Sequence, residues 1–419
     1  MAGFVQHLRD GAWVTPERTR LVALALLAPA LIAIAWLIGS SDGLNDALNR
    51  PLGTDFASFY AAGTLVRDGL AAAAYNPAAH FAREQAIFGA ATQYYAFQYP
   101  PVFLLVSAAL AQLPYLPALV LWQAATLVLY VLAIRAIVSA GDRAPVQGVS
   151  KNLWLLLALA YPAVFINLGH GQNGFLTAAL FAGALALLDR RPVAAGILIG
   201  LMIYKPQFGM MIPLVLVVTA RWRVVAAAAL TVAAIVAISL LVTGVDSWRA
   251  FIASTAFTRE TLLEQGDVGF FKMQSVFAWV GMWGGPVALA YVVQGAVTLA
   301  TAAALAILWR SKARYPLKAA ALLIGTLLAT PFSLDYDLML VAPAIAFLAI
   351  DAAQRGAAPK NVPWEKTLLA ALWIVPLIAR TFPMFTHIPL GAPVMLLSFI
   401  WLLFRAFRVD ADIIESQAA

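Results

Sequence analysis

The chain has 419 residues, of which 63% are hydrophobic and 11% charged, and it contains no cysteine. Soluble domains are about half apolar and about a quarter charged, so this composition predicts an all-α polytopic membrane protein whose residues 1–419 form a single integral membrane domain. The lack of cysteine excludes a disulfide framework and a thiolate-metal site. The net charge of +7 does not indicate a nucleic-acid partner, because in a membrane protein the Lys and Arg residues report orientation instead.

Twelve apolar runs are expected to cross the membrane as helices. A helix needs roughly 20 apolar residues, at about 1.5 Å per residue, to span a hydrocarbon core of about 30 Å. Several runs are shorter, which predicts that neighbouring helices shield them from lipid or that they end in a water-filled cavity. The predicted spans are 21–39, 116–139, 153–168, 175–188, 193–204, 208–220, 224–242, 287–309, 317–330, 338–350, 367–380 and 392–404.

Basic residues set the predicted orientation, since Lys and Arg collect in cytoplasmic connections. Every connection that the twelve spans place on one side is basic, namely 140–152 with Arg143 and Lys151, 189–191, 221–223, 310–318, 355–366 and the tail after Arg405. Both termini are therefore expected in the cytoplasm, in a multi-pass protein of the inner or plasma membrane. Residues 41–101 and 244–285 are then two long loops on the periplasmic or extracellular side.

The first of these loops is expected to contain helices. Residues 55–74 place Phe56, Phe59 and Tyr60 on one side and Arg67 toward the other, which predicts an amphipathic helix at the membrane interface. Residues 77–90 are expected to form a second helix. Residues 102–113 are apolar but too short for an ordinary span, and we expect them not to cross.

Several cations lie at the outward ends of the predicted helices, against the general charge rule. They include His170, Lys205, Arg259 and Lys272. Cations kept beside apolar helix ends usually have an anionic partner. A phosphate or diphosphate on a lipid would supply one.

Short motifs along most of the chain resemble those of one enzyme family. In order they are Asp55-Phe56 with Phe59-Tyr60, Tyr75-Asn76, Tyr99-Pro100-Pro101, Gly171-Gln172-Asn173, Ala195-Gly196 leading to Tyr204-Lys205-Pro206-Gln207, and Pro331-Phe332-Ser333. Each motif alone is weakly specific, but the ordered set resembles the alpha-mannosyltransferase family 87 of glycosyltransferases over about residues 55–348. This family includes the mannosyltransferases that elongate phosphatidylinositol mannosides.

The resemblance implies a fold, a donor and a mechanism. It implies the C-type glycosyltransferase (GT-C) helical bundle, a polyprenyl-phosphate-linked sugar donor, a lipid or glycan acceptor, and inversion at the anomeric carbon. An acidic residue of the first outward loop activates the acceptor hydroxyl in such enzymes, which gives Asp55 the role of catalytic base. Some members carry His after the Pro-x-Ser segment, where this chain has Leu334-Asp335-Tyr336-Asp337.

The residue types at these positions suit the same chemistry, independently of the family resemblance. A sugar on a lipid monophosphate already has its leaving group, so no metal and no cofactor are expected. One carboxylate can deprotonate an acceptor hydroxyl, and Lys and Arg can bind a departing phosphate through charge-assisted hydrogen bonds. The predicted catalytic residue is Asp55, and the predicted substrate-binding residues are Tyr99, His170, Gln172, Asn173, Lys205, Gln207, Arg259, Lys272 and Asp335.

Structural roles are open for the acidic residues. Asp55 could be only an N-cap of the loop helix, worth about 1 kcal/mol. Asp335 and Asp337 could bind a metal as a pair, although a cap or an ion pair with Arg380 is favoured. Glu84, with its neighbour in sequence Arg83, is expected on a solvated face of a loop helix.

The cations and aromatic residues have similar alternatives. Lys205 could extend its ammonium group from a helix end to the membrane surface, and His170 could belong to a plain turn. Arg259 and Lys272 could lie on a solvated loop face. The aromatic residues around Tyr99 are most simply a belt at the membrane interface, and otherwise a platform on which a sugar stacks.

Two other classes of function remain as alternatives. A multispan transporter or a flippase of lipid-linked sugars would also have twelve helices with buried charges, although no inverted halves are evident. A polysaccharide polymerase or ligase would share the lipid-phosphate chemistry.

Overall fold

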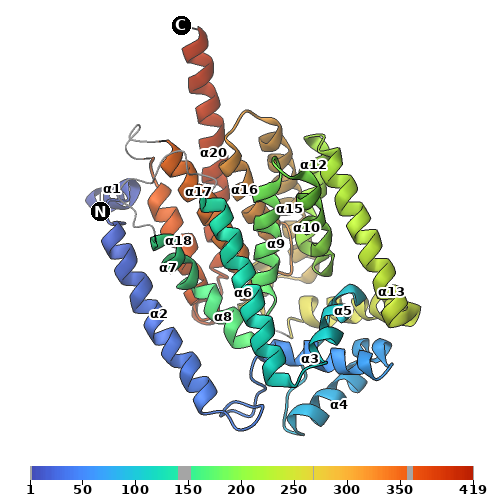
Figure 1. Ribbon diagram of the computed structural model, residues 1–419. Helices are drawn as coiled ribbons and strands as arrows, with labels where there is room; N and C mark the ends of the chain where they lie inside the picture. The colour runs from blue at the N-terminus through green and yellow to red at the C-terminus, as the bar shows by residue number, and fades with distance from the viewer. Residues whose placement is uncertain (1, 140–151, 268, 356–361, 419) are drawn as a thin grey trace.

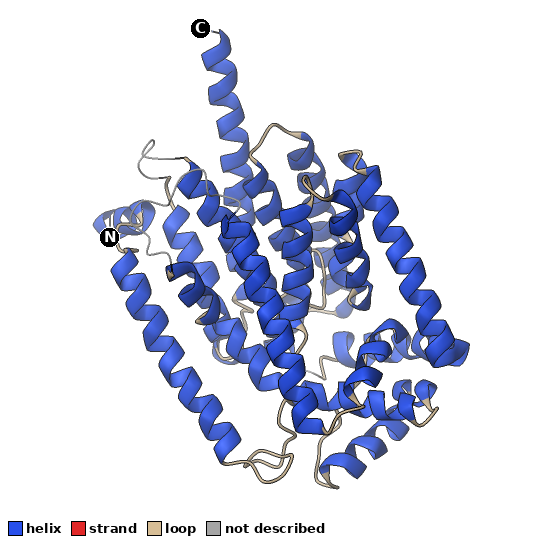
Figure 2. Ribbon diagram, in the orientation of Figure 1, coloured by secondary structure: helices blue, strands red, loops and turns tan. Residues whose placement is uncertain are grey.

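The computed structural model describes residues 2–139, 152–267, 269–355 and 362–418, and within these ranges it is helical without β-strands (Figures 1 and 2). Short 3₁₀ or π helices are labelled η. The first half contains α1 (Ala2–Asp10), α2 (Pro16–Gly39), α3 (Thr54–Arg67), η1 (Ala71–Tyr75), α4 (Pro77–Phe88), α5 (Pro101–Leu110), α6 (Tyr115–Ser139), α7 (Leu153–Leu159), α8 (Pro162–His170), α9 (Gly174–Leu187) and α10 (Pro192–Leu201). The second half contains η2 (Met202–Tyr204), α11 (Pro206–Gly209), α12 (Met211–Val218), α13 (Trp222–Thr258), η3 (Arg259–Glu264), η4 (Phe270–Lys272), α14 (Val276–Met282), α15 (Val287–Arg310), α16 (Tyr315–Leu328), η5 (Asp335–Leu340), α17 (Val341–Gln354), α18 (Glu365–Ile378), α19 (Phe382–Thr386) and α20 (Gly391–Ala418).

The helices form a bundle whose two ends carry different parts of the chain. Both termini lie at one end, and α3, α4 and α5 lie at the opposite end (Figure 1). Helix α16 is in the centre of the bundle, since every residue from Ala319 to Leu328 is buried. Helix α2 stands at the edge, where Ala23 is the one buried residue of its 24. Its apolar surface is therefore free to face lipid.

The helix lengths confirm a multi-pass membrane protein. Helices α2, α6, α13 continued by η3, α15, and α17 preceded by η5 are long and apolar enough to cross a bilayer, and α7 with α8 would be a sixth span bent by 43°. Six shorter apolar helices accompany them, formed by α5, α9, α10 with η2, α11 with α12, α16 and the first part of α20. The predicted count of twelve crossings stays a prediction.

Helix α13 is longer than the predicted span over 224–242. It continues to Thr258 through a break at Gly244, whose φ of 76° is a left-handed conformation that favours glycine. The predicted loop over 244–285 therefore begins as a helix. Helix α5, predicted not to cross, packs against α3 and α13. Its contact with α3 depends on Gly63, where an added Cβ would lie 2.0 Å from the Ser107 carbonyl oxygen.

The first outward loop is more buried than its sequence pattern predicts. Every residue of α3 from Phe56 to Leu65 is buried, so α3 is an internal helix and the predicted amphipathic helix with one solvated face is wrong. Helix α4 forms where a second helix was predicted, but Glu84 is fully buried rather than solvated. Its carboxylate lies 3.4 Å from His80 and accepts a hydrogen bond from the Tyr95 backbone at 3.0 Å. Burial raises the pKa of Glu84.

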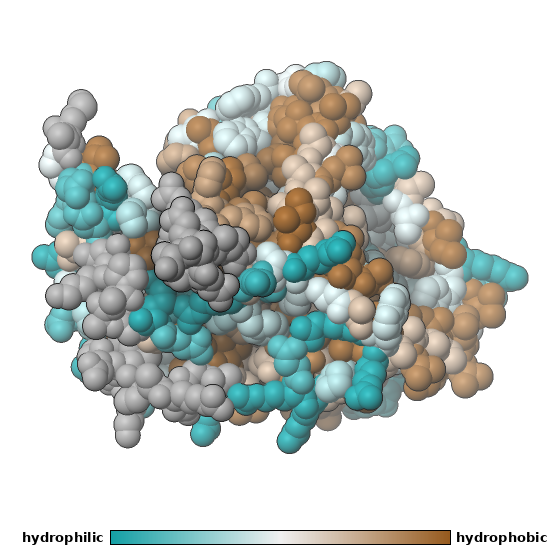
Figure 3. All heavy atoms as spheres, turned by 90° about the horizontal axis from the view of Figure 1, so that it is seen from above, coloured by the Kyte–Doolittle hydropathy of each residue, from teal (hydrophilic) through white to brown (hydrophobic). Residues whose placement is uncertain are grey.

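The end that carries the termini has hydrophilic patches among apolar residues (Figure 3). A buried charge network ties α17, α18 and α20 together there, because Asp351 and Glu365 both pair with Arg355 and Arg405. Arg314 adds a contact of 3.0 Å to Asp351. Buried charges persist when they are paired in this way. Residues 140–151 and 356–361 of the predicted basic connections lie outside the described residues.

Candidate active site

Asp55 lies at the start of α3, at the end of the bundle opposite the termini. The residue that caps this helix is Gly53, with φ 68°, and no side chain caps the helix. The Asp55 carboxylate instead accepts a hydrogen bond at 2.9 Å from Gln172 Nε2, and its side chain is 28% exposed. A role as N-cap is therefore excluded for Asp55.

Gln172 is held rigidly in the turn between α8 and α9. Its Oε1 accepts hydrogen bonds from the Tyr99 hydroxyl at 3.2 Å and from the Asn173 backbone N–H at 2.7 Å. Burial, and then the charge of Asp55, raise the pKa of Tyr99 well above its usual range, so the phenol keeps the proton that it donates. Because two donors converge on Oε1, the NH₂ group of Gln172 must face Asp55.

Asn173 adds a buried amide that has spare hydrogen-bonding capacity. The residue is 0% exposed, and its Oδ1 and Nδ2 make no hydrogen bond of normal geometry with a described residue, although the side chain lies close enough to the Tyr99 hydroxyl to act on it. A buried polar group without a partner costs about 1–3 kcal/mol. A hydroxyl of a bound molecule that reached this amide would remove that cost.

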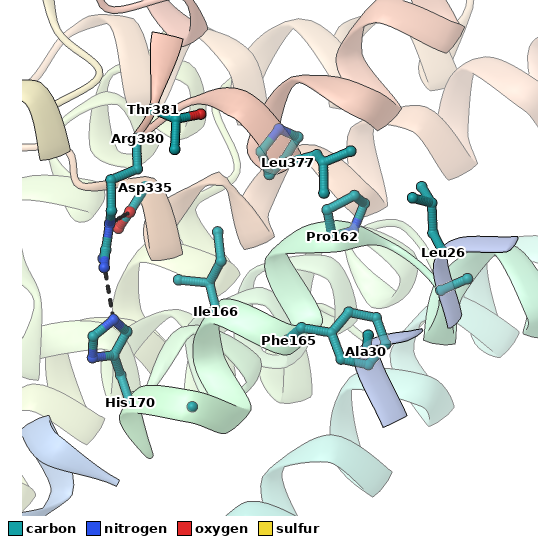
Figure 4. A pocket seen from close by; sticks show the side chains of 13 residues that line it. Leu26, Ala30, Pro162, Phe165, Ile166, His170, Asp335, Leu377, Arg380 and Thr381 are labelled. Carbon is teal, nitrogen blue, oxygen red and sulfur yellow. Dashed lines mark hydrogen bonds and ion pairs between the residues drawn. The ribbon is translucent and has the colours of Figure 1, made fainter. Parts of the chain in front are cut away.

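His170 lies between Asp55 and a second charged pair. Its Nδ1 is 2.6 Å from Thr54 Oγ1 and 3.9 Å from an Asp55 oxygen, and its Nε2 is 3.1 Å from Arg380 Nη2. Arg380 in turn donates from Nε to Asp335 at 2.6 Å. Figure 4 shows the Arg380 guanidinium directed at the imidazole, with Asp335 beside it. The contact between Arg380 and Asp335 is the ion pair that the sequence analysis favoured for Asp335.

Lys205 forms a buried ion pair within the protein. It is buried and contacts Asp337 at 2.7 Å, and its ammonium group also lies 5.2 Å from the ring centroid of Tyr336. Asp337 is therefore matched by a cation and by the Leu334 backbone N–H, and the two acidic residues Asp335 and Asp337 have separate partners. No group of three or more His, Cys, Asp or Glu side chains that could hold a metal ion occurs in the described ranges.

The remaining predicted residues divide into two groups. Lys272 is half-buried. It lies near the site, since its ammonium group interacts electrostatically with Arg380, Asp55 and Asp335. Burial lowers the pKa of Lys272, Arg380 lowers it further, and the two carboxylates act in the opposite direction. Gln207, in α11, is partly buried. Arg259 is 64% exposed and pairs with Glu264 at 3.3 Å, so the structure does not bring it to Asp55.

An apolar crevice leads to this polar cluster. It has a volume of about 350 Å³ and lies between α2, α8 and the end of α18. Its walls are mostly apolar, and its charged lining consists of Asp335 and Arg380 beside His170 (Figure 4). The apolar lining includes Leu26, Ala30, Pro162, Phe165, Ile166 and Leu377. The crevice is suited to a molecule with a long apolar part and an anionic group.

Two contributors to this cluster were absent from the predicted substrate-binding set. Arg380 was considered only as an ion-pair partner, although a cation at the outward end of a span was itself a signal. Thr54 precedes Asp55 directly, and its contact with His170 crosses 116 positions of sequence. No spacing pattern predicts such a contact.

Comparison with known proteins agrees with the motifs in the sequence. The family model for glycosyltransferase family 87 matches residues 97–331, which is more than half of the 419 residues. No curated protein and no solved structure matches the chain. The matched range contains Tyr99, His170, Gln172 and Lys272, whereas Asp55 precedes it.

Proposed function

Since the chain belongs to glycosyltransferase family 87 and is a membrane glycosyltransferase, we propose that it uses a polyprenyl-phosphate-linked hexose as donor. The sugar is mannose-like, the acceptor is a hydroxyl of a lipid or glycan, and the anomeric carbon is inverted. The reaction takes place on the periplasmic or extracellular side of the inner or plasma membrane.

The observation that carries this proposal is the crevice that joins an apolar channel to a cation and a carboxylate. A polyprenyl chain suits the apolar walls, because burial of each CH₂ group contributes about 0.8 kcal/mol. Arg380 lies where the phosphate would follow the chain. It donates one hydrogen bond each to Asp335 and His170. A bidentate contact of a phosphate with Nη1 and Nη2 would use the nitrogen that now donates to His170.

The transfer itself needs one base and a neutralised leaving group. The acceptor oxygen bonds to the anomeric carbon as the bond from that carbon to the phosphate oxygen breaks. The bonding electrons leave with the phosphate, which changes from a singly charged diester to a doubly charged monoester, and the acceptor proton passes to Asp55. Arg380 and Lys272 offset the new negative charge. Asn173 is available to a sugar hydroxyl.

Gln172 orients the base in this scheme. Its amide N–H fixes one oxygen of Asp55 at 2.9 Å, and its own orientation is fixed by Tyr99 and Asn173. The other oxygen of Asp55 is left for the acceptor hydroxyl. Such positioning by a supporting hydrogen bond affects the rate more than the affinity.

The same scheme assigns an orientation in the membrane. We place both termini in the cytoplasm and the loops 41–101 and 244–285 outside, with twelve crossings in one integral membrane domain. Helix α3, which carries Asp55 in its first turn, lies at the end opposite the termini, and this supports the orientation (Figure 1). Several basic connections belong to the end that carries the termini, as expected for the cytoplasmic side.

Product formation separates this function from its alternatives. We expect the purified protein in detergent, without a gradient, to produce a new glycoside from one member of a panel of polyprenyl-phosphate sugars, detected by mass spectrometry. A transporter or flippase would form no glycosidic bond. A polymerase or ligase would yield a chain or transfer a preassembled glycan rather than a single hexose.

A further inference from the structure

The hydrogen bonds of His170 determine which of its nitrogens carries the proton. Arginine can only donate hydrogen bonds, so the contact of 3.1 Å from Arg380 Nη2 makes Nε2 of His170 an acceptor. An imidazole with an accepting Nε2 is neutral and carries its proton on Nδ1. That proton is then donated to Thr54 Oγ1 at 2.6 Å.

Few other ionisable groups face this imidazole. Asp55, on α3, lies 3.9 Å from Nδ1, and Asp335, at the start of η5, reaches the ring only through Arg380. Lys272, on η4, is coupled electrostatically to Arg380, Asp55 and Asp335. The parts of α2 that line the crevice are apolar, and α9 has no charged residue. Arg380 therefore controls access of a proton to Nε2.

A phosphate in the crevice would compete with His170 for the guanidinium. We propose that donor binding draws Arg380 away from Nε2 and that His170 then takes up one proton from solvent, which couples the donor phosphate to the charge beside Asp55. This inference rests on the proposed function. The imidazole is 25% exposed, so a proton can reach it from water.

The proposed proton uptake balances the charge of the complex. The donor phosphodiester brings one negative charge into a partly buried site, and the imidazolium adds one positive charge. His170 keeps Nδ1–H directed toward Thr54, with Asp55 3.9 Å from the same nitrogen, and it gains an Nε2–H that can donate to the phosphate. The imidazolium thus forms beside Asp55 only when the donor is present.

Binding of methyl geranylgeranyl phosphate tests the coupling directly. This phosphodiester carries one fixed charge across neutral pH and lacks a sugar, so the identity of the sugar does not matter. Calorimetry in two buffers with different ionisation heats, between pH 6 and pH 8, measures the protons taken up. We expect uptake to approach one proton per ligand and affinity to strengthen as pH falls, by up to tenfold per pH unit.

Matched variants test whether His170 is the group that takes up the proton. His170→Gln keeps a donor and an acceptor in a similar place but does not titrate, so its affinity should not change with pH. His387→Asn alters an exposed histidine whose left-handed backbone, φ 55°, asparagine tolerates, and it should behave as wild type. Binding without proton uptake, or uptake that persists in His170→Gln, would overturn the inference while leaving the donor site intact. Failure of the phosphodiester to bind would overturn the proposed donor site as well.

A spectroscopic measurement checks the starting state without any ligand. The chain has four histidines, so ¹⁵N-histidine labelling gives few signals, and His170→Gln assigns the one in question. In the ligand-free protein at pH 8 we expect a protonated Nδ1 and an unprotonated Nε2. A protonated Nε2 would refute the inference.

Discussion

Gln172→Glu places a second carboxylate against the proposed base while preserving side-chain shape. The Gln172 nitrogen lies 2.9 Å from Asp55 Oδ2, and two unit charges at that distance repel by about 1.4 kcal/mol at the dielectric constant of water and about 6 kcal/mol at an effective value near 20. Each 1.36 kcal/mol corresponds to about one pH unit. Asp55 is 28% exposed, so solvent screening favours the lower half of this range.

The two carboxylates of that variant should therefore share one proton to higher pH. In a transfer assay we expect the acid limb of the kcat/KM profile to move up by about 1–2 pH units, so that the rate falls at the acid end of the profile and recovers as pH rises. Gln172→Met removes the hydrogen bond without adding charge, and should lower the rate without moving the limb. A folded Gln172→Glu enzyme with an unmoved limb would refute the placement of the base.

Three other changes probe the orientation, the buried ion pair and the buried acid. In this cysteine-free chain, Gln93→Cys should react with an impermeant maleimide in intact cells and Lys312→Cys only after lysis, and the reverse pattern would invert the proposed orientation. Lys205→Ala should lower the free energy of unfolding by about 3–5 kcal/mol, because it leaves Asp337 buried without its cation; unchanged thermal stability would contradict this. Burial raises the pKa of Glu84, so the folded protein binds more protons than the unfolded chain and loses stability as pH rises above about 4.5. Glu84→Gln should lack that loss, and parallel pH profiles of Tm for the two proteins would count against it.

The sequence predicts the class of fold well, because its signals are local. Apolar runs and the basic residues between them depend on composition within about 20 residues, and the predicted runs coincide with helices of the bundle. The ordered motifs also led to the family that the comparison confirms. The predicted exposure of the loop helix over 55–74 is wrong because it depends on contacts that are distant in the sequence. Its burial arises from α5, which packs against α3, and from α13, which packs against η1.

The site shows the same division between local and distant causes. Asp55 and Gln172 each belong to a short motif, and the structure joins them at 2.9 Å across 117 positions. Arg259 has the same outward location as Lys272, yet only Lys272 lies near Asp55. Residue type and side of the membrane select candidate cations, but the path of the loop decides which of them reaches the carboxylate.

Asp55→Asn tests the central claim most directly, because it preserves shape while removing the basic lone pair. We expect donor binding and Tm near those of wild type and a turnover lower by about 10²–10⁴-fold, the usual contribution of a general base. Asp68→Asn, at an exposed ion pair with Arg83, is the matched control and should keep the wild-type rate. If Asp55→Asn retained more than about a tenth of the wild-type turnover, or lost its fold instead of its rate, Asp55 would not be the base.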